Sequence, residues 1–323
     1  MKTITRKLFS LTLSAFALLL LMGAGVEEDS TQQLQTEKGT RGAQLVQTSE
    51  THDQEADQAH MVTAVAGSSV LTLVEDMDRT LTVDGKAVPS EVNKTQQGGT
   101  TYVALVPMAK ELDPSVSVTW DGGSQTVTVS SSKLNLTAKV GQLYLVANGR
   151  YLYIPEGVQL VDGRVTVPLS VLTEAFDASL TWNAATGVVA VTRGSGALTP
   201  ADQYYNQDDL FWLSRVIYAE SGNQPLEGMM AVGNVVLNRV NDPIYPNTIV
   251  GVLSQKNQFT TYQSGKLAYR TPNENSVIAA KLVLDGGVVE ETLGATHFDS
   301  CSNSWASRHK TCVAVIGGHR FYA

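Results

Sequence analysis

Two patterns of hydrophobic positions divide this chain. Between residues 69 and 193, short runs such as Thr126-Val127-Thr128-Val129 alternate polar and apolar positions, and Asx-Gly pairs such as Asp162-Gly163 separate the runs. A period of two predicts half-buried strands, and Asx-Gly pairs between apolar runs predict hairpins. From residue 208 onward, apolar residues recur every three or four positions, which predicts helices. We therefore expect a multidomain protein, with a mostly β (α+β) repeat domain over residues 69–193 and a mostly α domain over residues 208–323.

The β domain contains an internal repeat. The motif Val103-Ala104-Leu105 returns as Val167-Pro168-Leu169, and Trp120 returns as Trp182. Each unit reads as a strand, a helix and a further strand that carries the tryptophan. For both tryptophans, packing in the core is the favoured interpretation, and a sugar-stacking platform is the alternative.

This repeat resembles the copper amine oxidase N-terminal-like stalk domain that is common on secreted bacterial proteins. The resemblance implies a spacer or a module that associates with the cell wall. Residues 69–193 contain no histidine. A copper centre needs imidazole or sulfur ligands, so we expect no copper in this domain.

Three further segments are predicted. Residues 1–25 join a basic start to an apolar run and small residues, which predicts a cleaved signal peptide and a secreted or wall-bound protein; an uncleaved membrane anchor is the alternative. Residues 26–68 are acidic and lack apolar periodicity, which predicts a disordered linker. Residues 194–207 cluster Gly, Ser, Thr and Pro, which predicts a second linker. The net charge of −8 lies mostly in the acidic segment, and no basic patch indicates nucleic-acid binding.

One carboxylate, Glu220, lies at the end of an apolar helical run. It continues the stripe of Ile217, a Ser-Gly-Asn-Gln-Pro turn follows it, and a second helix begins at Pro225. Burial disfavours the charged form of a carboxyl group, so a raised pKa would let Glu220 protonate a glycosidic oxygen. The alternative is a solvated helix-end carboxylate, or an ion-pair partner of Arg215 or Arg239.

Four blocks resemble the catalytic domain of SleB-type cell-wall hydrolases, the spore-cortex-lytic family. They lie at residues 215–240, 245–249, 258–260 and 316–322. The resemblance implies a lysozyme-like, mostly α fold, peptidoglycan as the substrate, and cleavage of the MurNAc–GlcNAc β-1,4 bond without a cofactor. It places Glu220 on the catalytic glutamate of the family. It also supplies the substrate-binding candidates, which are Tyr218, Gln258, Phe259, Trp305, His319 and Tyr322. For Trp305 and Tyr322 simple packing is the alternative, and for His319 a structural hydrogen bond.

A single acid in the motif favours a lytic transglycosylase over a two-carboxylate hydrolase. Asp299 is the candidate partner if the reaction is hydrolytic. One alternative function is a zinc-dependent N-acetylmuramoyl-L-alanine amidase that uses His297, His309 and His319. Another is a wall-binding protein without activity. Gln224 stands where the family usually has an acid, so wall remodelling in growing cells is as plausible as a role in the spore cortex.

Two cysteines, Cys301 and Cys312, lie near the C-terminus. Outside the cytoplasm such a pair tends to oxidise, so we expect a disulfide, with two plain thiols as the alternative. Nearby histidines make zinc the competing interpretation, but the usual short ligand spacings are absent, and we expect no metal.

Overall fold

The computed structural model describes residues 81–183 and 186–323. The expected signal peptide, the acidic linker and the first expected strand, residues 70–74, lie outside the described residues. No helix within the described ranges is long and apolar enough to cross a membrane.

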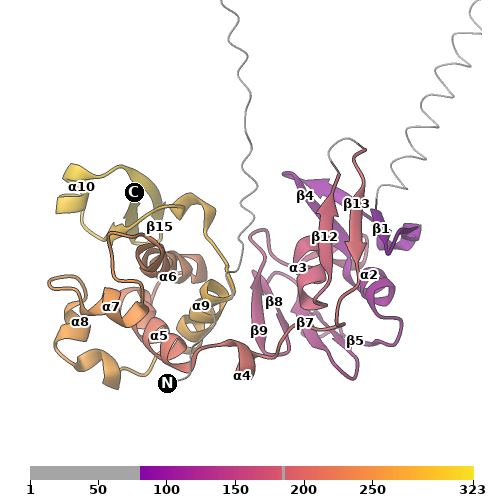
Figure 1. The fold of residues 1–323 in the computed structure, drawn as a ribbon, viewed down its shortest axis with the longest axis horizontal. Coiled ribbons are helices and arrows are strands. Elements are labelled where there is room, and N and C mark those ends of the chain that lie inside the picture. The colour runs from indigo at the N-terminus through magenta and orange to yellow at the C-terminus, as the bar shows by residue number, and fades with distance from the viewer. Residues whose placement is uncertain (1–80, 184–185) are drawn as a thin grey trace, which may run out of the picture. The chain divides into compact units, whose positions relative to one another are not determined.

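The internal repeat is visible in the central sheet of the strand-rich domain (Figure 1). This sheet has the order β10-β11-β4-β3. Strands β4 and β11 are antiparallel, with Val103 opposite Val167. These two residues are equivalent in the repeat, so the two units are related by a local two-fold at this pair. The strands are β3 (Thr95–Gln97), β4 (Thr100–Ala104), β10 (Gln159–Val161) and β11 (Arg164–Pro168).

In each unit a helix follows the central strand and leads to the strand that carries the tryptophan. The first unit contains α2 (Leu105–Leu112), β5 (Ser117–Asp121) and β6 (Thr126–Ser130), and the second contains α3 (Leu169–Ala175), β12 (Ser179–Trp182) and β13 (Val189–Thr192). The sheets have the orders β5-β6-β7-β8-β9 and β12-β13-β1-β2. Their other members are β7 (Asn135–Lys139), β8 (Tyr144–Ala147), β9 (Arg150–Tyr153), β1 (Leu81–Val83) and β2 (Lys86–Ala87), and η1 (Ser90–Val92) is a short 3-10 turn.

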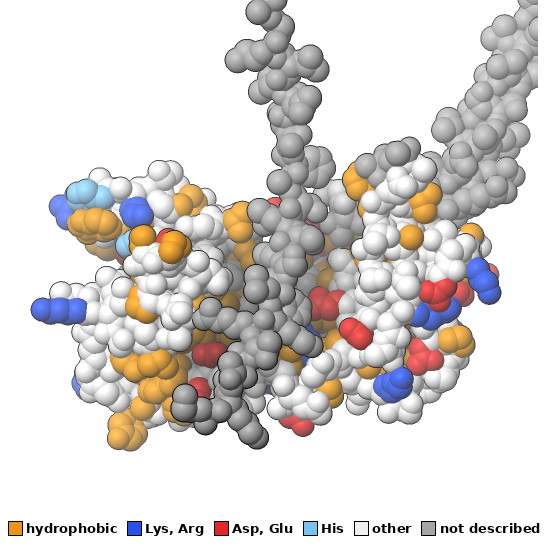
Figure 2. Space-filling model, viewed as in Figure 1, with side chains coloured by type: hydrophobic (Ala, Val, Ile, Leu, Met, Phe, Trp, Pro, Cys, Tyr) orange, Lys and Arg blue, Asp and Glu red, His pale blue; other side chains and the backbone are white. Residues whose placement is uncertain are grey.

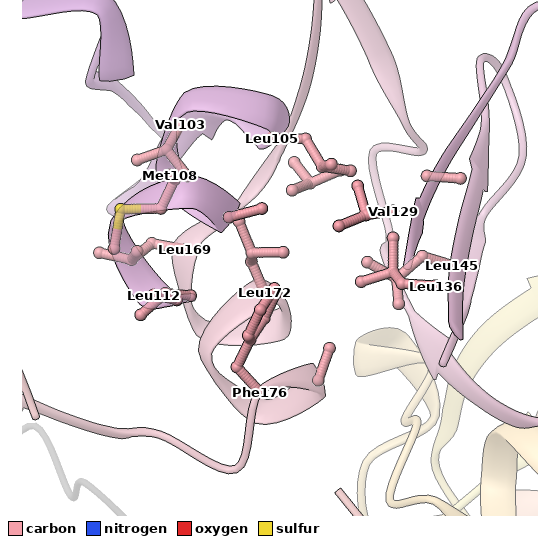
Figure 3. Packing of buried hydrophobic residues seen from close by; sticks show 14 of the residues in the cluster. Val103, Leu105, Met108, Leu112, Val129, Leu136, Leu145, Leu169, Leu172 and Phe176 are labelled. Carbon is pink, nitrogen blue, oxygen red and sulfur yellow. The ribbon is translucent and has the colours of Figure 1, made fainter. Parts of the chain in front are cut away.

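The core of this domain lies between the two helices and the five-stranded sheet. The apolar faces of α2 and α3 contact the inner face of β6, β7 and β8 (Figure 3). The labelled side chains include Met108, Leu172, Val129, Leu136 and Leu145, each fully buried. The alternation along the sequence therefore marked the inner face of the sheet correctly.

The two tryptophans are not in this core, so the favoured sequence interpretation was wrong. Trp120 is 48% exposed and Trp182 is 64% exposed. The physical reason is the sheet order, because β5 and β12 are both edge strands, and among the residues that the structure describes no further strand covers their ends.

The segment expected to be a linker, residues 194–207, is ordered and packed. It forms the short helix α4 (Ala201–Tyr204), and Leu198 joins the core of the strand-rich domain. The hydroxyl of Tyr205 donates a hydrogen bond to Asp285. Asp285 also pairs with Arg150 of β9, with Nε of Arg150 2.7 Å from Oδ1. The segment still connects the two domains, and its apolar and aromatic residues explain the packing contacts that the turn formers did not predict.

The C-terminal domain is mostly helical, as expected. Its core forms where α5, α6 and α9 pack on one another (Figure 1). A small sheet with the order β14-β16-β15 closes the domain. The elements are α5 (Gln207–Ser221), α6 (Leu226–Asn241), α7 (Ile249–Ser254), α8 (Thr260–Gln263), η2 (Lys266–Tyr269), α9 (Glu274–Leu284), η3 (Glu290–Thr292), β14 (His297–Asp299), α10 (Trp305–His309), β15 (Cys312–Ile316) and β16 (His319–Tyr322).

Candidate active site

The candidate acid is held by the last turn of α5. The side chain of Asn206 caps the start of this helix by accepting hydrogen bonds from the amides of Asp208 and Asp209. Leu213 and Ile217 are fully buried, so the stripe that ends at Glu220 faces the core as the periodicity predicted.

Glu220 is half-buried and has no hydrogen-bond or ion-pair partner in the described part of the chain. Burial alone raises the pKa of its carboxyl group above the usual range. An unpaired carboxyl group that is withdrawn from water is typical of a general acid, because its protonated form persists toward neutral pH.

The two arginines that could have neutralised Glu220 are engaged elsewhere. Nη1 of Arg215 donates to the carbonyl of Phe211, and its guanidinium lies 3.5 Å above the centre of the Phe211 ring. Nε of Arg239 donates to the carbonyl of Thr296 at 2.6 Å. The alternative interpretation of Glu220 as an ion-pair partner of these residues is therefore wrong.

The turn after Glu220 is fixed at both ends. Nδ2 of Asn273, the residue that caps α9, donates to the carbonyl of Gly222 at 2.9 Å. The backbone amide of Gly318 donates to Oε1 of Gln224 at 2.7 Å. The family's usual acid is replaced here by an amide that ties the turn to the loop between β15 and β16. This contact gives Gln224 a structural role beside the acid.

Arg239 connects three segments of the site and was not singled out as a binding residue from the sequence. It is buried, and besides Thr296 it binds Oε1 of Gln258 at 3.0 Å. Its guanidinium also lies near the ring of Phe259. The sequence signal for this role was an arginine among the valines of an apolar helix. Such an arginine is buried, and a buried cation needs several hydrogen-bond acceptors.

Arg239 also affects the neighbouring histidine. Burial, together with the charges of Arg239 and Lys310, lowers the pKa of His297 to about 4. His297 is therefore neutral near pH 7. Its ring lies 5.6 Å from that of Trp305, which stacks on His309.

The predicted substrate-binding residues fall into two groups. Gln258 is exposed, Trp305 is 55% exposed and Tyr218 is half-buried, so these three can reach a ligand. Phe259, His319 and Tyr322 are buried, at 3%, 8% and 2% exposure. Phe259 belongs to the domain core. Arg239 contacts both Gln258 and Phe259, and the Gln224 turn links Glu220 to the loop before His319.

The expected disulfide is absent, because Cys301 and Cys312 are both free and exposed. β16 lies between β14, which leads to Cys301, and β15, which begins at Cys312. Two strand spacings are about 9.5 Å, and a disulfide needs its Cα atoms within about 7 Å. Asp299, the candidate partner of Glu220 in a hydrolytic reaction, accepts hydrogen bonds from Ser304, from the amide of Cys301 and from Tyr322.

No three His, Cys, Asp or Glu side chains converge as a metal site in the residues that the structure describes. Nδ1 of His309 contacts the carbonyl of Trp305, and Nδ1 of His297 contacts the hydroxyl of Thr296. Nδ1 of His319 is buried without a partner. His297, His309 and His319, the three histidines of the amidase hypothesis, therefore do not converge on one site in the described structure.

Comparison with known families agrees with this geometry. Residues 223–322 match the family model of the Cell Wall Hydrolase, and residues 82–191 match that of the Copper amine oxidase N-terminal domain. The chain thus consists of a cell wall hydrolase domain preceded by a copper amine oxidase N-terminal domain. Glu220 lies just before the matched residues, so its role rests on the geometry above.

Individual curated proteins are also similar to part of this chain. The chain is 31% identical to the spore cortex-lytic enzyme of Bacillus subtilis (strain 168) over 118 residues, 36% of this chain and 38% of that protein. It is 41% identical to that of Bacillus cereus over 121 residues, 36% of this chain and 45% of that protein. The chain therefore spans less than half the length of these curated relatives.

A solved structure, the catalytic domain of the germination-specific lytic transglycosylase SleB from Bacillus anthracis, is 31% identical. The match covers 39% of this chain and all of that one, with a TM-score of 0.34. The family match and the 41% identity to the Bacillus cereus enzyme confirm the sequence resemblance to the spore-cortex-lytic family.

Proposed function

We propose that this protein is a peptidoglycan glycosidase that cleaves the MurNAc–GlcNAc β-1,4 bond as a lytic transglycosylase. The observation that carries the proposal is the Glu220 carboxyl group, which is half-buried, unpaired in the described structure, and raised in pKa by burial. The solved SleB relative, named as a lytic transglycosylase, supports the same reaction class.

In the proposed reaction Glu220 acts twice. The protonated carboxyl group first gives its proton to the glycosidic oxygen as the bond from that oxygen to C1 of the muramic sugar breaks. The resulting carboxylate then takes the proton of the 6-hydroxyl of the same sugar while its oxygen bonds to C1. The product is a 1,6-anhydro end, and the proton returns to Glu220. No water is consumed, so no second carboxylate is required to activate one.

The exposed or half-buried members of the predicted set are the candidates for binding the glycan. Tyr218 lies two positions before Glu220 on α5, and Trp305 offers an exposed ring on α10. Gln258 is held by Arg239 and can offer its amide to sugar hydroxyls. Phe259, His319 and Tyr322 support these residues from the core. His297 stays neutral and can donate or accept a hydrogen bond without adding charge.

We place the protein at the cell wall, outside the membrane, with the strand-rich domain as a wall-associated stalk. The substrate supports this location, and the expected signal peptide provides the route. A role in the spore cortex follows the curated relatives. Gln224, which stands where the family usually has an acid, is a departure from the family pattern. For this reason wall remodelling in growing cells is the second candidate role.

The test is turbidity loss of purified peptidoglycan with the wild-type chain and two variants. Glu220→Gln should abolish lysis and retain binding. Glu227→Gln is the matched control, because Glu227 accepts a hydrogen bond from Tyr153 that glutamine can also accept. Persistent lysis by Glu220→Gln would remove the assignment. Loss of activity on chelation would favour the zinc amidase instead.

A further inference from the structure

Trp120 and Trp182 occupy equivalent positions on the two repeat units, and both are exposed. Trp120 lies opposite Val127 on β6, and Trp182 lies opposite Val189 on β13. Directly opposed residues share a face of the sheet, and Val127 is only 2% exposed. Each tryptophan therefore stands on the core-facing side of its sheet, beyond the end of the core.

An exposed aromatic side chain gains little hydrophobic stabilisation on folding, since its apolar area stays in water in both the folded and the unfolded state. An exposed tryptophan occurs in both repeat units, at positions that the local two-fold relates. An Asx residue follows each tryptophan and closes a turn: Asp121 accepts a hydrogen bond from the amide of Gly123, and Asn183 accepts one from Thr186. The turns place both rings at the ends of edge hairpins, where a ligand can approach them.

The charge of the strand-rich domain indicates whether a ligand of these tryptophans is charged or neutral. Residues 81–193 contain eight Lys and Arg residues against nine Asp and Glu residues. On the face drawn in Figure 2, side chains of both signs are interspersed. An anionic polymer would select for a basic surface. A flat aromatic ring in nearly neutral surroundings instead suits an uncharged, ring-shaped ligand with apolar C–H faces.

We propose that Trp120 and Trp182 are two equivalent stacking sites for the neutral sugar rings of a glycan strand. The proposal rests on the proposed function, because it takes the same polymer as its ligand. The strand-rich domain would then hold the substrate while the hydrolase domain cleaves it. Two weak sites on one chain raise the affinity for a polymer more than for a short oligosaccharide.

The test is co-sedimentation with purified peptidoglycan sacculi, using the full chain with Glu220→Gln so that the sacculi stay intact. Trp120→Ala and Trp182→Ala should each weaken binding about tenfold, as truncation of an anchoring tryptophan does, and the double variant should bind more weakly than either. Trp182→Tyr should restore most of the binding, since it keeps a flat ring. Leu160→Ala is the matched control, because Leu160 is 46% exposed in the same domain.

A soluble probe checks the chemistry. In a chain with Trp212→Phe and Trp305→Phe, Trp120 and Trp182 are the two remaining tryptophans, and a β-1,4-linked N-acetylglucosamine oligosaccharide should protect their fluorescence from acrylamide quenching. Binding by the double variant equal to that of its parent would overturn the proposal. So would loss of binding after anionic polymers are stripped from the sacculi. Lysis by the chain with native Glu220 is measured separately, so failure of these sites leaves the proposed reaction standing.

Discussion

Gly317, in the loop between β15 and β16, tests how the turn after Glu220 is held. Gly317 has φ of +57°, and a Cβ added there would lie 2.2 Å from Oε1 of Gln224. The Gln224 side chain must then move and lose its hydrogen bond from Gly318. A left-handed backbone costs a residue with Cβ about 1 kcal/mol, and the lost hydrogen bond about 1 kcal/mol more. We expect Gly317→Ala to lower the free energy of unfolding by about 2 kcal/mol.

The matched control is Gly265→Ala. Gly265 has φ of +70°, and nothing lies within 4 Å of its added Cβ, so it should cost only about 1 kcal/mol. Urea unfolding of the three proteins measures the difference. Gln224→Ala should remove the excess cost of Gly317→Ala, because both act on one hydrogen bond. Equal costs for the two glycine variants would refute the claim that this contact holds the turn.

Three further predictions follow from buried charges. Arg150→Ala leaves the fully buried carboxylate of Asp285 without its cation, so we expect thermal unfolding to report a loss of about 3–5 kcal/mol; a loss below 1 kcal/mol would contradict a buried pair. Arg239→Gln removes the donors to Thr296 and Gln258 and should raise KM on soluble glycan; an unchanged KM would deny Arg239 its positioning role. The raised pKa of Glu220 means that the folded state holds this proton more tightly than the unfolded state. The stability contributed by the protonated Glu220 is thus lost as pH rises through the folded pKa. Because glutamine stays neutral, Glu220→Gln should be more stable than wild type at pH 8 but not at pH 4.

Local patterns predicted the elements well. The repeat, the hairpins and the helices at Ile249 and Glu274 follow from the spacing of apolar residues and turn formers within short windows. The burial of the stripe ending at Glu220 followed from the same periodicity. These features depend on near neighbours in the sequence, which is the information that a single chain carries most directly.

Features that depend on the order of strands, or on contacts between segments distant in the sequence, could not be predicted from the sequence. Trp120 was expected in the core because alternation gives its face but not the edge position of β5. The disulfide was expected because a cysteine pair outside the cytoplasm tends to oxidise, whereas in the structure β16 lies between β14 and β15 and separates the two cysteines. Arg239 was considered as an ion-pair partner of Glu220, and its actual acceptors could not be predicted because they come from distant loops.

The central claim is that Glu220 donates the proton that breaks the glycan and then recovers it from the sugar. Mass spectrometry of the muropeptides released from sacculi tests this most directly. The wild-type chain should release products with 1,6-anhydro muramic ends, and Glu220→Gln should release none. Reducing muramic ends, free lactyl groups, or anhydro products from the Glu220→Gln chain would contradict the account.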